Sequence, residues 1–146
     1  MTNPRREVAR GLVLNAADRL LLVKWRDPLT GREFWEPPGG GSQVGESFEA
    51  TVRREVAEET GLADIEVGAC VAEFDRRFVW AGREFDCVER YFICRLVTNR
   101  RIGLQLDEVE RSGYLEIDWW SLSDLASTAE QLEPSELLQM LEARGR

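Results

Sequence analysis

The chain has 146 residues, of which 43% are hydrophobic and 32% charged, a size that suffices for one globular domain over residues 1–146 without a disulfide or structural zinc. With 19 basic and 27 acidic side chains, the formal net charge is −8, which disfavours nucleic acid and anionic membranes as partners. Histidine is absent, which excludes Ser-His and Cys-His nucleophile pairs and leaves carboxylates, Lys, Arg and backbone groups for any chemistry.

The first half of the chain predicts strands, an ordered loop and a helix. From hydrophobic alternation and turn residues we expect strands at 8–14 and 20–25 around a turn at 15–18, a polar loop at 26–33, a Pro- and Gly-rich loop at 34–41, and a helix at 47–60. Pro37 and Pro38 forbid a helix in the second loop. Ser47 is the expected N-cap of the helix and Gly61 the residue that ends it.

The second half predicts further strands and two short helices. In chain order we expect strands at 65–75, 77–80 and 84–97, a basic loop at 99–103, an acidic loop at 104–113, a strand at 114–119, and helices at 121–129 and 134–143. Because residues 91–94 are all apolar, their strand is expected to lie centrally in the sheet. Pro134 is expected in the first turn of the last helix.

The cysteines and the lack of long apolar segments indicate the cellular compartment of the protein. Cys70, Cys87 and Cys94 are odd in number, form no Cys-x-x-Cys pair and lie in apolar runs, which predicts buried free thiols. No signal-peptide core follows the first charged residues, and no apolar run approaches the roughly 18 residues of a membrane span. These features predict a cytoplasmic protein with no membrane partner.

The helix predicted at 47–60 carries glutamates on its apolar side. At about 100° per residue, its buried stripe is formed by Phe48, Val52 and Val56. Glu55 and Glu59 fall within or beside this stripe and Glu58 lies on the same turn, so a solvated acidic face does not account for them. Three ionised carboxylates near a core face repel one another and lose hydration. A divalent cation relieves both costs, and oxygen ligands suit Mg²⁺ or Mn²⁺.

A glycine run precedes this helix. Gly39, Gly40 and Gly41 allow the backbone to approach a ligand closely, and the helix N-terminus offers free N–H groups to an anion. A tight turn explains the glycines equally well when they are taken alone. Together with the glutamates, they favour a site for a metal ion and a diphosphate.

Residues 40–62 resemble the complete Nudix box, GX5EX7REUXEEXGU, where U is apolar. Gly40 and Glu46 occupy the first two fixed positions, and Arg-Glu-Val-Ala-Glu-Glu-Thr-Gly-Leu at 54–62 fills all the others. The resemblance implies an α/β protein with the Nudix fold, a mixed β-sheet sandwiched between α-helices. It also implies a hydrolase that cleaves a nucleoside diphosphate linked to another moiety, a small-molecule nucleotide derivative, by attack of water on phosphorus.

The resemblance also implies residue roles. Glu55, Glu58 and Glu59 would hold Mg²⁺, or Mn²⁺ in its place, with a backbone carbonyl of Gly39 or Gly40 as a further ligand. Arg54 would brace the cluster together with Glu46.

The general base stays open between Glu55 and an acid of the loop at 104–113. Glu108 and Glu110 are the leading loop candidates, beside Asp107. In an extended strand, Glu108 and Glu110 would face the same way, so the sequence does not choose between them.

Three further questions stay open from the sequence alone. A catalytically weak Nudix-fold domain that binds or senses a nucleotide is the alternative to an enzyme, and an isoprenoid-diphosphate isomerase is disfavoured by the missing histidine. Phe78 and Trp80 are expected to serve packing, while the candidates for phosphate contact are Lys24, Arg26, Arg32 and Arg83. An edge strand can pair with that of a second copy, so a homodimer is also open.

Overall fold

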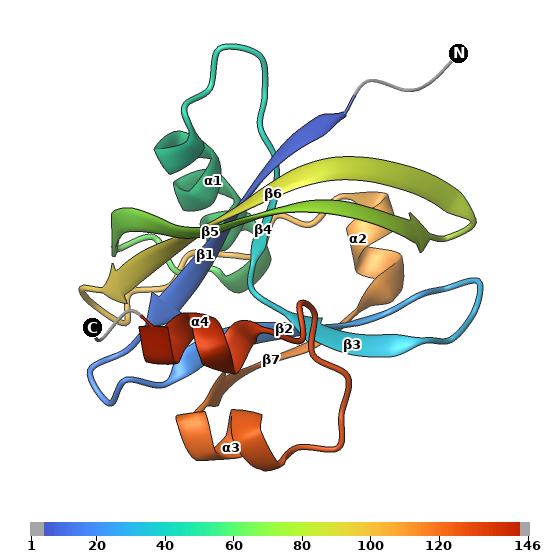
Figure 1. Cartoon of the computed structure of the whole chain (residues 1–146). Helices are drawn as coiled ribbons and strands as arrows, with labels where there is room; N and C mark the ends of the chain where they lie inside the picture. Colours follow the sequence, from blue (N-terminus) through green and yellow to red (C-terminus); the bar gives the residue numbers. More distant parts are fainter. Residues whose placement is uncertain (1–4, 144–146) are drawn as a thin grey trace.

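A curved, mixed β-sheet with helices on both sides organises the computed structural model, which describes residues 5–143 (Figure 1). Its elements in chain order are β1 (Arg6–Leu14), β2 (Leu20–Arg26), β3 (Glu33–Glu36), β4 (Gly39–Gly41), α1 (Phe48–Thr60), β5 (Ile65–Trp80), β6 (Arg83–Leu96), α2 (Glu108–Gly113), β7 (Tyr114–Trp120), α3 (Leu122–Ser127) and α4 (Leu137–Ala143). The strand order is β3-β2-β1-β6-β5, with β4 paired to β1 and β7 paired to β2.

The sheet is mixed because β1 runs parallel to β6 and antiparallel to β2 and β4. Alternating residues of β1 face opposite layers, as the pleat of a strand requires. Ala9 and Val13 pack with α1, and Leu12 and Leu14 pack with α3 and α4. Each face therefore has its own apolar core, and the predicted sheet between helices is confirmed.

The long hairpin of β5 and β6 extends beyond its pairing with β1 and curves over α2 and β3 (Figure 1). Ala81 and Gly82 form its turn with positive φ angles of 52° and 79°. The two strands expected at 65–75 and 77–80 are one continuous strand, because the hairpin pairing runs unbroken through Arg76. β6 lies between β1 and β5, as the apolar residues 91–94 predicted.

Three other predicted boundaries were wrong. Residues 34–41 include β3 and β4, since pairing with β2 and β1 supplies the ladder bonds that a sequence rich in proline and glycine does not suggest. The acidic stretch expected as a loop contains α2. The last helix begins at Leu137 instead of Pro134, which follows a cis peptide bond outside the helix.

The exposure of the cysteines corrects one further prediction. Cys87 and Cys94 are buried free thiols as predicted, but Cys70 is exposed because β5 is an edge strand.

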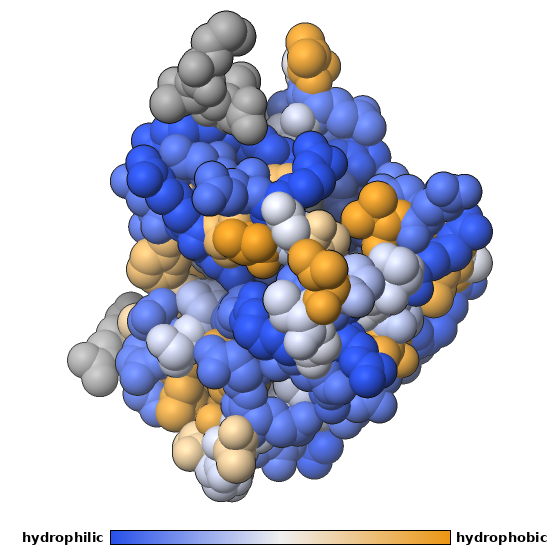
Figure 2. Space-filling view, turned by 90° about the vertical axis from the view of Figure 1, so that its right-hand side faces the viewer, coloured by the Kyte–Doolittle hydropathy of each residue, from blue (hydrophilic) through white to orange (hydrophobic). Residues whose placement is uncertain are grey.

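Large hydrophobic side chains on the face shown in Figure 2 are separated by hydrophilic ones. Among residues 5–143, no helix has both the length and the apolar character needed to cross a bilayer.

Candidate active site

Local caps fix the helix that carries the predicted glutamates. The Ser47 hydroxyl accepts a hydrogen bond from the Ala50 N–H at 3.1 Å, and Gly61 ends α1 in the left-handed region with φ 76°. Both predicted ends of the helix are confirmed. These caps set which turn of α1 presents Glu55, Glu58 and Glu59.

Strand β4 lies directly against this turn because it contains only glycine. A Cβ on Gly40 would lie 2.7 Å from the carboxylate of Glu55, which a real side chain would displace. The Gly39 N–H donates a hydrogen bond to Glu59 Oε2 at 3.2 Å. The glycines therefore permit a close approach of backbone to carboxylates, beyond forming a turn.

Three carboxylates from two helices converge beside β4. Oxygen atoms of Glu55, Glu59 and Glu110 all lie within 4.8 Å of one another. Glu55 and Glu59 are only 9% and 3% exposed. Burial raises the pKa of all three carboxyls, and the neighbouring Glu55 raises the pKa of Glu59 further. A cluster of this kind is stabilised by protons or by a multivalent cation.

Glu110 reaches the cluster because α2 begins with a capping box. The Glu110 N–H donates to Asp107 Oδ1 at 2.8 Å, and the Asp107 N–H donates to Glu110 Oε1 at 3.2 Å. The helix turns Glu110 into the pocket and leaves Glu108 exposed outside it, so the expectation that both face the same way was wrong. The Asp-x-x-Glu spacing at 107–110 is the sequence signal for this helix.

Arg54 links the box helix to the segment before it. Its guanidinium donates to both carboxylate oxygens of Glu46, from Nε at 2.9 Å and from Nη2 at 3.0 Å. These bonds lower the pKa of Glu46 to about 2. Nη1 also donates to Glu55 Oε1 at 2.8 Å and lies 3.3 Å from Glu58 Oε2, while Nη2 donates to the Gly41 carbonyl.

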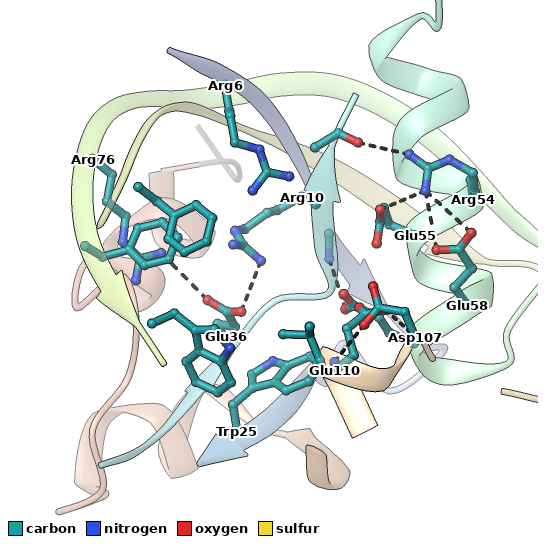
Figure 3. Close-up of a pocket in the computed structure, with 18 of the residues that line it drawn as sticks. Arg6, Arg10, Trp25, Glu36, Arg54, Glu55, Glu58, Arg76, Asp107 and Glu110 are labelled. Carbon is teal, nitrogen blue, oxygen red and sulfur yellow. Dashed lines mark hydrogen bonds and ion pairs between the residues drawn. The ribbon is translucent and has the colours of Figure 1, made fainter. Parts of the chain in front are cut away.

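Glu58 occupies a different position from the other box glutamates. Its carboxylate is bound to Arg54 and lies outside the group formed by Glu55, Glu59 and Glu110. It still lines the same pocket (Figure 3).

The pocket has a volume of about 500 Å³ and continues past β4 to a second side. Alternate glycines define the two sides, since a Cβ on Gly40 would meet Glu55, whereas one on Gly39 or Gly41 would meet Arg10 or Arg6. Figure 3 shows Arg6, Arg10, Glu36 and Arg76 across β4 from Glu55 and Glu58. We call the part with Glu55, Glu59 and Glu110 the acidic side and the part with the three arginines the basic side.

The basic side was not found from the sequence. The suggested phosphate contacts Lys24, Arg26, Arg32 and Arg83 do not line this pocket, whereas Arg6, Arg10 and Arg76 do. No local motif marks these three arginines, because the pairing of distant strands brings them together.

Aromatic side chains complete the pocket wall. Trp80 packs edge-on against Trp25 and Phe34, with ring centroids 6.2 and 5.9 Å apart, and Phe78 stacks on Phe85 at 5.1 Å. All five rings line the pocket, so Phe78 and Trp80 border the ligand space in addition to packing. A concave site with aromatic walls and a few converging charges is typical of small-molecule binding.

Comparison with known proteins identifies the family. A family model described as NUDIX domain matches residues 4–141. An RNA pyrophosphohydrolase of Saccharophagus degradans is 33% identical over 121 residues, covering 76% of this chain and 67% of that protein. One of Caulobacter vibrioides is 30% identical over 148 residues, covering 92% and 81%. A relative from Mycobacterium tuberculosis is 31% identical over 124 residues, and the chain spans about half of its length, 47%.

Solved structures support the fold. A NUDIX hydrolase from Nitrosomonas europaea superposes with a TM-score of 0.72 at 19% identity, covering 97% of this chain and 89% of that one. A MutT protein from Methanosarcina mazei superposes with a TM-score of 0.69 at 21% identity, covering 100% and 96%. The chain therefore belongs to the Nudix family and is a hydrolase.

Proposed function

We propose that this chain is a pyrophosphohydrolase dependent on a divalent cation, cleaving a nucleoside diphosphate linked to another moiety. The observation that carries the proposal is the convergence of Glu55, Glu59 and Glu110 beside the glycine strand β4. The related proteins named RNA pyrophosphohydrolase support a phosphoanhydride as the bond that is broken.

The donor set of the acidic side fits Mg²⁺. Hard carboxylate oxygens are its preferred protein ligands, and Mg²⁺ takes its remaining ligands from water and phosphate. Glu55, Glu59 and Glu110 would hold the ion, with Glu58 beside them and the backbone of Gly39 and Gly40 nearby. When bound, Mg²⁺ neutralises phosphate oxygens and lowers the pKa of a water molecule. Mn²⁺ accepts the same ligands.

The chain's own residues supply position and a proton acceptor. Arg54 orients Glu55 through their 2.8 Å bond and is itself held by Glu46. Glu110, from a separate helix, either completes the ligand set or takes the proton from the attacking water, and Glu55 is the other candidate base. The aromatic rings beyond β4 would receive the nucleoside.

Metal dependence is the first test. The purified protein is incubated with nucleoside triphosphates, dinucleoside polyphosphates and ADP-ribose, and the products are separated by chromatography. We expect no turnover after treatment with EDTA and full recovery with Mg²⁺ or Mn²⁺, because three clustered carboxylates repel phosphate without a cation. Undiminished turnover by rigorously metal-free protein would contradict the proposal.

A matched pair of variants on α2 tests the role of Glu110. Glu110→Gln is expected to lower kcat by roughly 10²–10⁴-fold, whereas Glu108→Gln, an exposed neighbour, is nearly silent. Mn²⁺ binding measured by electron paramagnetic resonance separates the two roles, since loss of a ligand weakens binding and loss of a base does not. Equal activity of both variants would assign the proton transfer to Glu55.

A further inference from the structure

The basic side of the pocket contains three arginines with different surroundings. Arg10 lies 3.3 Å from Glu36 and 3.1 Å from Glu89, and Arg76 lies 3.2 Å from Glu89 and also pairs with Glu133. The charges of Arg10 and Arg76 are therefore already balanced by carboxylates. Neither guanidinium is free to neutralise an anionic ligand without breaking a buried ion pair.

Arg6 has no such partner. Among residues 5–143, no carboxylate oxygen lies within 4.0 Å of its guanidinium. Its Cζ lies 5.5 Å from the ring centroid of Phe85, and a Cβ on Gly41 would meet its Nη2 at 2.5 Å. The ring and the bare glycine strand hold this cation at the pocket, where Figure 3 shows it across β4 from Glu55.

The spacing of the two charges follows from β4. A Cβ on Gly40 would meet Glu55 and a Cβ on Gly41 would meet Arg6. Neighbouring residues of a strand rise by roughly 3.3 Å and face opposite sides. A ligand that extends past β4 from the acidic side therefore meets a cation in a protein of net charge −8. A phosphate group provides the oxygen atoms that a guanidinium binds through paired hydrogen bonds.

We propose that Arg6 is a specificity-determining residue that binds a further phosphate of the substrate, beyond the diphosphate held at the acidic side. This inference rests on the proposed function. It assigns the substrate to compounds with three or more linked phosphates, in preference to a diphosphate joined to an uncharged sugar.

Binding of two non-hydrolysable probes tests the proposal. They are adenosine triphosphate and adenosine diphosphate analogues with methylene groups in place of the bridging oxygens, titrated calorimetrically in the presence of Mg²⁺. Arg6→Gln is expected to weaken binding of the triphosphate analogue about 10-fold and to change binding of the diphosphate analogue little. Arg6→Lys retains a charge and should recover part of the loss.

Arg83→Gln is the matched control. Arg83 lies at the same 5.5 Å from the Phe85 ring but does not line the pocket, so its removal tests charge and ring contact alone. Thermal denaturation verifies that each variant is folded. The proposal is overturned if the unaltered protein does not bind the triphosphate analogue, if Arg6→Gln weakens both analogues equally, or if Arg83→Gln has the same effect.

Binding and hydrolysis assays on the unaltered protein and the Arg6→Gln variant distinguish failure of this inference from failure of the proposed function. Selective binding of the triphosphate analogue through Arg6, without hydrolysis of any unmodified phosphoanhydride, would contradict the proposed function and support the role of Arg6. Hydrolysis of phosphoanhydrides with no selective loss in Arg6→Gln would support the function and overturn the role of Arg6.

Discussion

Two groups of buried charges lie on opposite sides of β4, and they differ in how far each buried charge is paired with an opposite charge. On the basic side, Glu89 is completely buried yet contacts Arg10, Arg76 and the hydroxyl of Tyr91. On the acidic side, Glu59 is nearly as buried, and its carboxylate lies within 4.8 Å of the carboxylates of Glu55 and Glu110. One group is internally balanced, and the other has excess negative charge.

The pKa values express this difference. Burial opposes ionisation of Glu89, but Arg10 and Arg76 outweigh it and lower the pKa of Glu89 to about 2. Burial and the neighbouring Glu55 raise the pKa of Glu59 well above its usual range. Balanced buried charges are typical of a structural ion-pair network, whereas an unbalanced cluster in a pocket is typical of a site that binds a cation.

The largest effect is expected on the acidic side. Glu59→Gln removes one charge from the cluster and should lower kcat by roughly 10²–10⁴-fold, while the melting temperature stays equal or rises because repulsion is relieved. Steady-state kinetics with Mg²⁺ and thermal denaturation measure the two quantities. Glu49→Gln, on the exposed part of the same helix, is the control. If Glu59→Gln unfolds the protein, Glu59 has a structural role. If the variant is folded and its kcat is normal, Glu59 is not needed for turnover.

The opposite result is expected on the basic side. Glu89→Gln leaves Arg10 and Arg76 without their shared carboxylate and should reduce the free energy of unfolding by about 3–5 kcal/mol. Urea denaturation measures this loss. Glu73→Gln, an exposed residue of the adjacent strand that pairs with Arg90, should change it by less than about 1 kcal/mol. Equal stabilities of both variants would show that the buried network contributes nothing.

Arg54 offers a smaller test of geometry within the acidic side. Arg54→Lys keeps the charge but loses the two bonds to Glu46, so kcat should fall about 10-fold. The neighbouring Arg53→Lys, on the exposed side of α1, should have normal kinetics. Full activity of Arg54→Lys would mean that a point charge is sufficient at this position.

The smallest expected effect is on the pH dependence of stability, to which Glu59 and Glu89 contribute with opposite signs. For Glu59 the folded pKa lies above the unfolded value of 4.5, so its contribution to stability is lost as pH rises through the folded pKa. For Glu89 the folded pKa is about 2, so its contribution is lost as pH falls below 4.5. Metal-free protein should therefore gain stability on acidification from neutral pH to about 4.5 and lose it below, as denaturant titrations can show. A Glu59→Gln variant should lack part of the gain.

Much of the acidic side was predictable because its determinants are local. Ser47, Gly61 and the spacing of Glu55 and Glu59 act within one helix, and a helix of fixed ends places residues four apart on the same face. The glycines of β4 were predicted to permit close approach, although their pairing with β1 was not. The Asp107-x-x-Glu110 capping box was also present in the sequence, and it alone separates Glu110 from Glu108.

The family was predictable from the sequence for the same reason, since the Nudix box is one continuous segment at residues 40–62. The basic side had no such signature, because Arg6 and Arg76 lie on β1 and β5, which are separated by β6 in the sheet. Likewise, Glu110 joins Glu55 only when α2 returns to the box helix, although the two residues are separated by more than a third of the chain. Contacts between residues so far apart depend on strand register and layer packing, which the tertiary structure alone decides.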